Sequence, residues 1–277
     1  MKAAVLGSPV AHSLSPVLHG AAYQALGLSD WSYQAIECDE AKLPGLISSL
    51  GPGWAGLSLT MPLKRAVLPL LDHVGPLAVA TGGANTVVFR PDGRYGYNTD
   101  VKGIVDALTE AGAPPPGSVV ILGAGATACS ALAALPELGA SGADIVAREP
   151  SRAAGVLIAA ERLHLPVRLR SFADLADVPI PDLLISTVPA GAADAYAGRI
   201  RAAGRMPAAV LDVVYSPWPT PLAEAASAAG AMVASGFAML LHQAAAQVEL
   251  MTGKSAPLQA MRAAGEAELA RRSAAAR

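Results

Sequence analysis

The sequence predicts an α/β protein with two domains, the second of which contains a doubly wound parallel sheet. Short apolar segments of strand length alternate with helical segments along most of the 277 residues. A glycine-rich turn follows one of these strands at residues 123–128, and a proline-rich segment at residues 113–117 separates two α/β halves. Strands that are separated by helices favour parallel sheets covered on both faces.

The first half is expected to begin with a short apolar strand and to continue with alternating helices and strands. Helical spacing runs from Pro16 to Leu26 and ends at Gly27, and a proline in a first-turn position opens another helix at Pro62. A Pro-Asp-Gly turn at residues 91–93 predicts a hairpin. The expected strands cover residues 3–6, 31–38, 56–60, 86–89 and 95–97, and a helix begins at Thr99 or Asp100.

The second half follows residues 113–117, which we interpret as a domain linker. Its expected strands cover residues 119–122, 144–147, 167–170, 183–186, 210–213 and 232–234. One helix is expected directly after the glycine-rich turn, and further helices are expected over residues 151–164, 222–229 and 237–251.

The composition excludes several classes of protein. Apolar residues make up 53% of the chain and charged residues 15%, which excludes intrinsic disorder, and the net charge of −2 excludes a polybasic nucleic-acid binder. Cys38 and Cys129 are too few for a disulfide framework, and residues 2–7 resemble a strand and not a signal peptide. We therefore expect a cytoplasmic protein. No metal is expected, because the five histidines and two cysteines show no ligand spacing.

A membrane protein is the main structural alternative, because residues 111–136 and 225–248 carry no charge over lengths that span a bilayer. The first stretch contains three consecutive prolines and the second contains His242, Gln243 and Gln247. Alanine, glycine and serine contribute little transfer free energy. We therefore expect no membrane span.

The glycine-rich turn has the pattern G-x-G-x-x-A between a strand and a helix, which indicates a dinucleotide site. Gly123 permits a tight turn, Gly125 lets the backbone approach a pyrophosphate, and Ala128 keeps the helix close to the strand. The second strand ends at Ala147 without the acid that is usual for NAD. Arg148 and Arg152 suit a 2′-phosphate, which favours NADP. Glu149 could instead contact the ribose of a dinucleotide. In the other interpretation, the two arginines only form the solvated start of a helix.

Three further clusters carry polar side chains where strands end. Ser13 and Ser15 precede a helix and suit a small anion, although Ser15 alone would also serve as a helix cap. Thr60 ends a strand and Lys64 lies in the next helical turn, where a solvated surface lysine is the simpler interpretation. Asn85 and Asp100 lie at loop ends, where Asp100 alone would also serve as a helix cap. Together these residue types suit a polyol.

These motifs occur together in an order that points to one family. They are G-x-P-x-x-H-S-x-S-P from Gly7, T-x-P-x-K from Thr60, A-N-T from Ala84, N-T-D-x-x-G from Asn98, G-A-G-x-x-A from Gly123, D-V-V-Y-S-P from Asp212 and G-F-A-M-L-L-H-Q-A from Gly236. In this order and spacing the chain resembles the shikimate dehydrogenase family over nearly its whole length. It departs from the commonest pattern at Gly20, Ser58, Ala126 and residues 147–149.

The resemblance implies roles for particular residues. Lys64 is the expected acid/base, and Asp100 positions it. The expected substrate-binding residues are Ser13, Ser15, Thr60, Asn85, Tyr215 and Gln243, with both serines on a carboxylate. The expected NADP(H)-binding residues are Gly123, Ala124, Gly125 and Ala126 at the pyrophosphate, Arg148 and Arg152 at the 2′-phosphate, and Val213 and Gly236 at the nicotinamide.

The resemblance also implies an activity, the NADPH-dependent reversible reduction of 3-dehydroshikimate to shikimate in chorismate and aromatic amino-acid biosynthesis. It implies a substrate-binding domain over residues 1–100, completed by helices over 237–277, and an NADP-binding Rossmann domain over 114–236. The alternatives are an NAD-dependent quinate/shikimate or aminoshikimate dehydrogenase and a non-catalytic ligand sensor. We expect a small-molecule substrate, no nucleic acid or membrane, and a monomer or homodimer.

Overall fold

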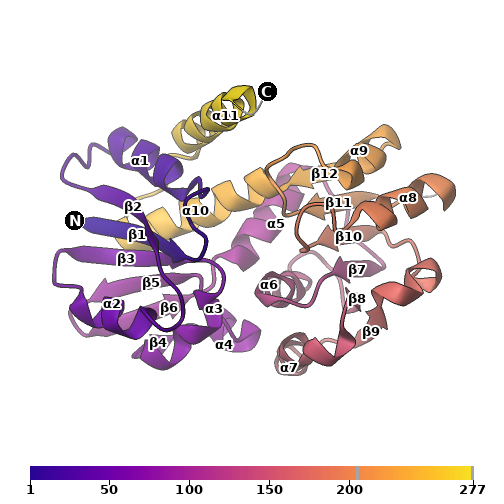
Figure 1. Cartoon of the computed structure of the whole chain (residues 1–277), viewed down its shortest axis with the longest axis horizontal. Helices are drawn as coiled ribbons and strands as arrows, with labels where there is room; N and C mark the ends of the chain where they lie inside the picture. The colour runs from indigo at the N-terminus through magenta and orange to yellow at the C-terminus, as the bar shows by residue number, and fades with distance from the viewer. Residues whose placement is uncertain (204–205, 276–277) are drawn as a thin grey trace. The chain divides into compact units, whose positions relative to one another are not determined.

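The computed structural model describes residues 1–203 and 206–275, which form two compact units (Figure 1). Unit 1 comprises Met1–Thr99 and Leu241–Arg277, and unit 2 comprises Asp100–Leu240. Helix α5 (Asp100–Glu110) packs against α6 (Ala126–Ala134) within unit 2. The first passage between the units therefore occurs before α5, and the proline-rich segment 113–117 lies inside unit 2.

The sheet of unit 1 has six strands in the order β2-β1-β3-β5-β6-β4. Its strands are β1 (Lys2–Gly7), β2 (Ser32–Glu37), β3 (Trp54–Leu59), β4 (His73–Val74), β5 (Thr86–Arg90) and β6 (Gly93–Tyr97). The first three are parallel, whereas β5 is antiparallel to both β3 and β6, which confirms the predicted hairpin. Because β5 is antiparallel, its first residue lies at the edge of the sheet where β3 ends.

Helices cover both faces of this sheet. They are α1 (Ser15–Ala25), α2 (Leu43–Ser49), α3 (Leu63–Ala66), η1 (Leu68–Leu70), α4 (Pro76–Thr81), the unit 1 part of α10 (Gly236–Thr252) and α11 (Leu258–Ala275). Alternate strand residues face opposite sides. Ala4 and Val87 pack with residues of α2 and α3, whereas Ala3 and Val88 pack with Met251 of α10.

The sheet of unit 2 is fully parallel, with the order β12-β11-β10-β7-β8-β9. Its strands are β7 (Val119–Leu122), β8 (Ala143–Ala147), β9 (Val167–Ser171), β10 (Leu183–Ser186), β11 (Ala209–Asp212) and β12 (Met232–Ser235). Besides α5 and α6, its helices are η2 (Pro150–Arg152), α7 (Ala154–Arg162), η3 (Phe172–Asp177), α8 (Asp194–Ala203) and α9 (Pro221–Ala228). This is the doubly wound order, and it reverses direction between β7 and β10.

Small side chains build much of the core of unit 2. Ile121 packs on one face with α5, α6 and α7, and Val120 and Leu122 pack on the other face with α8 and α9. Helix α6 contributes buried alanines in place of large residues, which lets it lie close to the sheet. The uncharged stretch 111–136 therefore contains the proline-rich segment, β7 and α6. Within residues 1–203 and 206–275, no helix has both the length and the apolar character that crossing a bilayer requires.

Candidate active site

The loop between β1 and α1 carries Ser13 and Ser15. The Ser15 amide donates a hydrogen bond to the Ser13 hydroxyl oxygen at 3.2 Å. Helix α1 begins at Ser15, and its N-cap residue Leu14 offers no side-chain bond. The interpretation of Ser15 as the capping residue is therefore wrong, because the capping oxygen belongs to Ser13. Ser15 itself is buried.

Glu37, at the end of β2, orders the beginning of the same loop. Its carboxylate accepts hydrogen bonds from the Ser8 hydroxyl at 2.6 Å and from the Val10 amide at 3.1 Å. The Ser8 amide donates to the carbonyl of Met61, in the loop after β3, at 3.0 Å. Sequence reasoning missed Glu37, which lies near the end of the predicted strand 31–38.

A buried group of amides and hydroxyls lies where β3 ends and β5 begins; we call it the amide cluster (Asn85, Thr86, Thr99, Gln243 and Gln247). The Asn85 side-chain oxygen accepts from the Thr99 amide and the Thr86 hydroxyl, both at 2.8 Å. The Asn85 side-chain nitrogen donates to the Gln243 side-chain oxygen at 3.3 Å. The structure thus brings two predicted substrate residues together across 158 positions of sequence.

Gln247 sets the direction of the hydrogen bonds behind Asn85. Its nitrogen donates to the Asn85 carbonyl at 3.3 Å and to the Thr86 hydroxyl at 3.0 Å. A carbonyl only accepts, so the Gln247 oxygen must face the other way, where the Ser58 hydroxyl donates to it at 2.6 Å. Sequence reasoning missed Gln247, although it follows Gln243 by one helical turn in the predicted helix.

Two aromatic residues complete this network. The Tyr33 hydroxyl donates to Ser58 at 2.6 Å, and the His19 ring stacks on Tyr33 with centroids 4.0 Å apart. His19 Nε2 lies 3.3 Å from the Gln247 oxygen, so this nitrogen carries the proton. Burial lowers the pKa of His19 to about 3, which keeps the ring neutral at neutral pH.

Thr60 and Lys64 follow β3 at the same edge of the sheet. The Leu59 amide donates to the Asn85 carbonyl at 2.7 Å, and the Ala84 amide donates to the Lys64 carbonyl at 2.8 Å. The segment before β5 is therefore attached both to the end of β3 and to α3. Lys64 is half-buried.

Asp100 is buried at the first position of α5, directly after Thr99 of the amide cluster. Asp100 belongs to unit 2 and Lys64 to unit 1. Their pairing stays a prediction.

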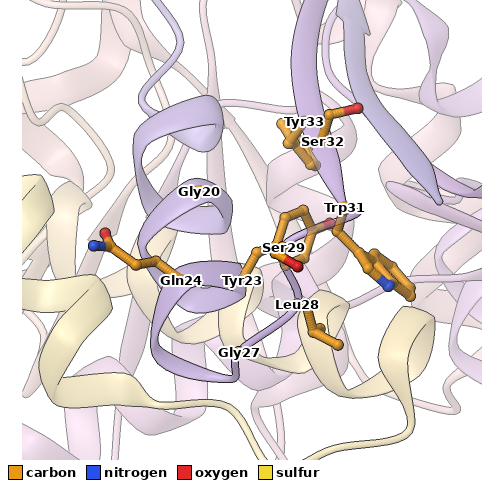
Figure 2. Close-up of a pocket in the computed structure, with 9 residues that line it drawn as sticks. All are labelled: Gly20, Tyr23, Gln24, Gly27, Leu28, Ser29, Trp31, Ser32 and Tyr33. Atoms are coloured by element: carbon orange, nitrogen blue, oxygen red, sulfur yellow. The ribbon is translucent and has the colours of Figure 1, made fainter.

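A surface hollow of about 480 Å³ on unit 1 lies between the end of α1 and the start of β2 (Figure 2). Tyr23, Trp31 and Tyr33 are its aromatic lining residues. None of the predicted substrate residues lines it. Tyr33 connects it to the amide cluster, because the Tyr33 hydroxyl bonds to Ser58, which in turn bonds to Gln247.

In unit 2 the glycine-rich turn lies at the point where the strand order reverses. Gly123 has a φ of +108°, and a Cβ there would overlap the hydroxyl of Thr187, the residue after β10. Gly125 is the N-cap of α6, and the position of its missing Cβ is open. A backbone without side chains at a helix start fits the pyrophosphate of a dinucleotide.

The end of β8 bears the residues that were predicted to select the cofactor. Ala147 is buried, whereas Arg148 and Glu149 are exposed directly after it. The strand therefore offers no buried acid at its end. The side chain of Arg152 lies outside the described part of the structure.

The segment between β11 and α9 carries Val213 and Tyr215, both half-buried. Asp212 holds the two ends of this segment, because its carboxylate accepts from the Thr220 hydroxyl at 2.7 Å and from the Val214 amide at 3.3 Å. Burial raises the pKa of Asp212. A Cβ at Gly236 would overlap the Val213 carbonyl, so only glycine permits this close approach.

Fold and local sites together define a class: a nicotinamide-dinucleotide-dependent α/β oxidoreductase with one doubly wound unit and one unit that presents neutral hydrogen-bonding groups beside a lysine. Comparisons with known proteins identify the family. The profile of the shikimate dehydrogenase substrate binding domain matches residues 5–87, and that of the shikimate 5′-dehydrogenase C-terminal domain matches residues 236–264.

Individual relatives agree over nearly the whole chain. A shikimate dehydrogenase (NADP(+)) of Citrifermentans bemidjiense is 40% identical over 265 residues, covering 92% of this chain and 91% of the relative. The crystal structure of Mycobacterium tuberculosis shikimate dehydrogenase has a TM-score of 0.85 at 45% identity and covers 96% of this chain and 98% of its own.

A third relative was solved with ligands. The Thermus thermophilus shikimate 5-dehydrogenase in complex with NADP(H) and shikimate has a TM-score of 0.82 at 33% identity, with 96% of this chain and 98% of that chain covered. The chain belongs to the shikimate dehydrogenase family. This confirms the resemblance inferred from the motifs and the predicted fold class.

Proposed function

We propose that this protein catalyses the reversible, NADPH-dependent reduction of 3-dehydroshikimate to shikimate. Unit 1 binds the substrate and unit 2 binds NADP(H). The observation that supports this most strongly is the amide cluster, in which Asn85 and Gln243 meet at the edge of the sheet where Thr60 and Lys64 follow β3. Neutral amides and hydroxyls beside one lysine suit a hydroxylated ring better than a highly charged ligand.

Each end of the substrate has its own group of residues in this proposal. The hydroxyls of Ser13 and Ser15 receive the carboxylate, and Thr60, Asn85 and Gln243 bind ring hydroxyls. Asn85 is held with its oxygen towards Thr86 and Thr99, and its nitrogen donates to Thr99 and Gln243, so a ring hydroxyl would have to share this donor with them. Tyr215, in unit 2, contributes a further substrate contact.

The chemistry requires one hydride and one proton. NADPH supplies the hydride when bound. Lys64 donates the proton to the oxygen that develops negative charge, and in the reverse direction its neutral amine removes the hydroxyl proton. Asp100 positions the Lys64 ammonium and the reacting hydroxyl. The backbone of residues 123–126 holds the pyrophosphate, and Val213 and Gly236 form the surface against the nicotinamide.

The cofactor interpretation depends on the end of β8. Arg148 and Arg152 bind the 2′-phosphate of NADP(H), and Ala147 offers no carboxylate to repel it. Glu149 is the one feature that favours the NAD-dependent quinate/shikimate or aminoshikimate alternative.

The direct test is formation of NADPH from shikimate and NADP⁺, followed by the absorbance of the reduced nicotinamide, together with the reverse reaction. Turnover in both directions supports the proposal. Shikimate binding without turnover would instead identify a ligand sensor.

We also infer a cytoplasmic protein that acts as a monomer or homodimer on a small molecule, with no nucleic-acid partner. Cys38 and Cys129 are both buried free thiols, which suits a reducing compartment. The net charge of −2 gives no attraction for a polyanion.

A further inference from the structure

The loop that carries Ser13 is held from the far end of the chain. Arg272, in the last turns of α11, donates from Nη1 to the His12 carbonyl at 2.6 Å and from Nη2 to the Ser13 carbonyl at 3.5 Å. The contacting residues lie 260 positions apart in the sequence. Helix α11 packs on α1, the helix that this loop enters (Figure 1).

Arg272 is itself fixed by a second contact. Its Nε donates to Glu268 at 2.7 Å, so one guanidinium joins a carboxylate and two backbone carbonyls. Arg271 and Arg272 lower the pKa of Glu268 to about 2, so this carboxylate stays ionised throughout the neutral range. A planar guanidinium with acceptors on three nitrogens has little rotational freedom.

The neighbouring Arg271 provides a natural comparison. It donates to the same Glu268 carboxylate at 2.8 Å, but its side chain is 69% exposed and makes no hydrogen bond or ion pair with the Ser13 loop among the described residues. The two arginines therefore share a charge and a partner, and they differ in whether they reach the loop.

We propose that Arg272 is a positioning residue for substrate binding: it fixes the backbone at His12 and Ser13 so that the Ser13 and Ser15 hydroxyls face the substrate carboxylate. This rests on the proposed function, which assigns the carboxylate to these serines. Hydroxyls are neutral donors, so they hold an anion well only when their geometry is set before binding. Glu37 and the Met61 carbonyl fix the start of the loop, and Arg272 fixes its end.

The test compares Arg272→Met with the matched control Arg271→Met. Arg272→Met is expected to raise the KM for shikimate by roughly 10-fold, because a hydrogen bond from a charged group is lost, and to leave kcat and the KM for NADP⁺ within about 2-fold. Arg271→Met is expected to match the wild type. Arg272→Lys is expected to raise the KM for shikimate less than Arg272→Met does, because a lysine ammonium reaches one carbonyl but cannot bridge both.

Hydrogen exchange provides a readout without substrate. The amides of residues 8 and 10–15 are expected to exchange faster in Arg272→Met and at the wild-type rate in Arg271→Met. A wild-type shikimate KM in Arg272→Met, or unchanged exchange in this loop, would overturn the inference while the enzyme stays active. If the wild-type protein does not turn over shikimate, the proposed function is refuted, and the positioning role, which rests on that function, is refuted as well.

Discussion

Replacing Gln247 by methionine tests whether the amide cluster contributes to folding stability as well as to binding. Gln247 is 1% exposed, and methionine has a similar size with no hydrogen-bond donor and only a weakly accepting sulfur. The Asn85 carbonyl keeps its bond from the Leu59 amide, and Tyr33 keeps its bond to Ser58. The Ser58 hydroxyl and His19 Nε2, however, lose the oxygen that accepts from both.

Two buried donors without acceptors correspond to a loss of roughly 2–6 kcal/mol in the free energy of unfolding. We expect the lower part of that range, because the Ser58 hydroxyl can rotate. At roughly 2–4 °C per kcal/mol, the melting temperature falls by at least about 4 °C. Urea denaturation and calorimetry measure both quantities.

Gln259→Met on α11 is the matched control, because Gln259 is exposed. It should change the free energy of unfolding by less than about 0.5 kcal/mol. If Gln247→Met is as stable as this control, the hydrogen-bond directions assigned around Gln247 are wrong.

Three other variants test His19, Gly236 and Lys64. His19→Phe keeps a ring against Tyr33 but removes a group whose pKa falls from 6.5 to about 3 on folding. Between these two pH values the unfolded chain binds one more proton than the folded protein, so the free energy of unfolding of the wild type drops as pH falls from 6.5, by up to about 1.4 kcal/mol per pH unit. His19→Phe is expected to lack this contribution to the pH dependence. Gly236→Ala places a methyl group on the Val213 carbonyl, which should cost about 1–3 kcal/mol and raise the KM for NADP⁺. Lys64→Ala should lower kcat by about 10²–10⁴-fold with little change in NADPH affinity.

Each of these variants has a result that counts against it. Equal acid slopes in wild type and His19→Phe, from urea denaturation at several pH values, would show that His19 is not neutral in the fold. An unchanged melting temperature in Gly236→Ala would contradict the close contact with Val213. Near-wild-type turnover in Lys64→Ala would remove Lys64 from the chemistry.

Local sequence patterns predicted much of the fold because the signals are themselves local. The G-x-G-x-x-A turn, the Pro-Asp-Gly hairpin and the apolar strands each depend on neighbouring residues, and the structure has each of them at the expected place. The passage between the units is different. A run of prolines suggests a linker, but helix α5 before it buries Val101, Ile104 and Leu108 in the core of unit 2, and this packing cannot be seen locally.

The same distinction applies to the candidate site. Asn85 and Gln243 could be predicted from the sequence because each occurs in a recognisable motif. Glu37 and Arg272 form hydrogen bonds to the backbone of the Ser13 loop and occur in no motif. Arg272 in particular contacts residues 260 positions away, and nothing near it in the sequence indicates that contact. Gln247 lies between these cases, since its spacing from Gln243 was visible but its partners come from β3 and β5.

The specificity of the enzyme tests the central claim most directly. Initial rates measured with shikimate and with quinate, each with NADP⁺ and with NAD⁺, give four values of kcat/KM. Shikimate with NADP⁺ is expected to have the highest value, because the roles proposed for Arg148 and Arg152 favour the 2′-phosphate and the role proposed for the amide cluster favours the shikimate ring. A higher value for quinate with NAD⁺ would contradict both assignments.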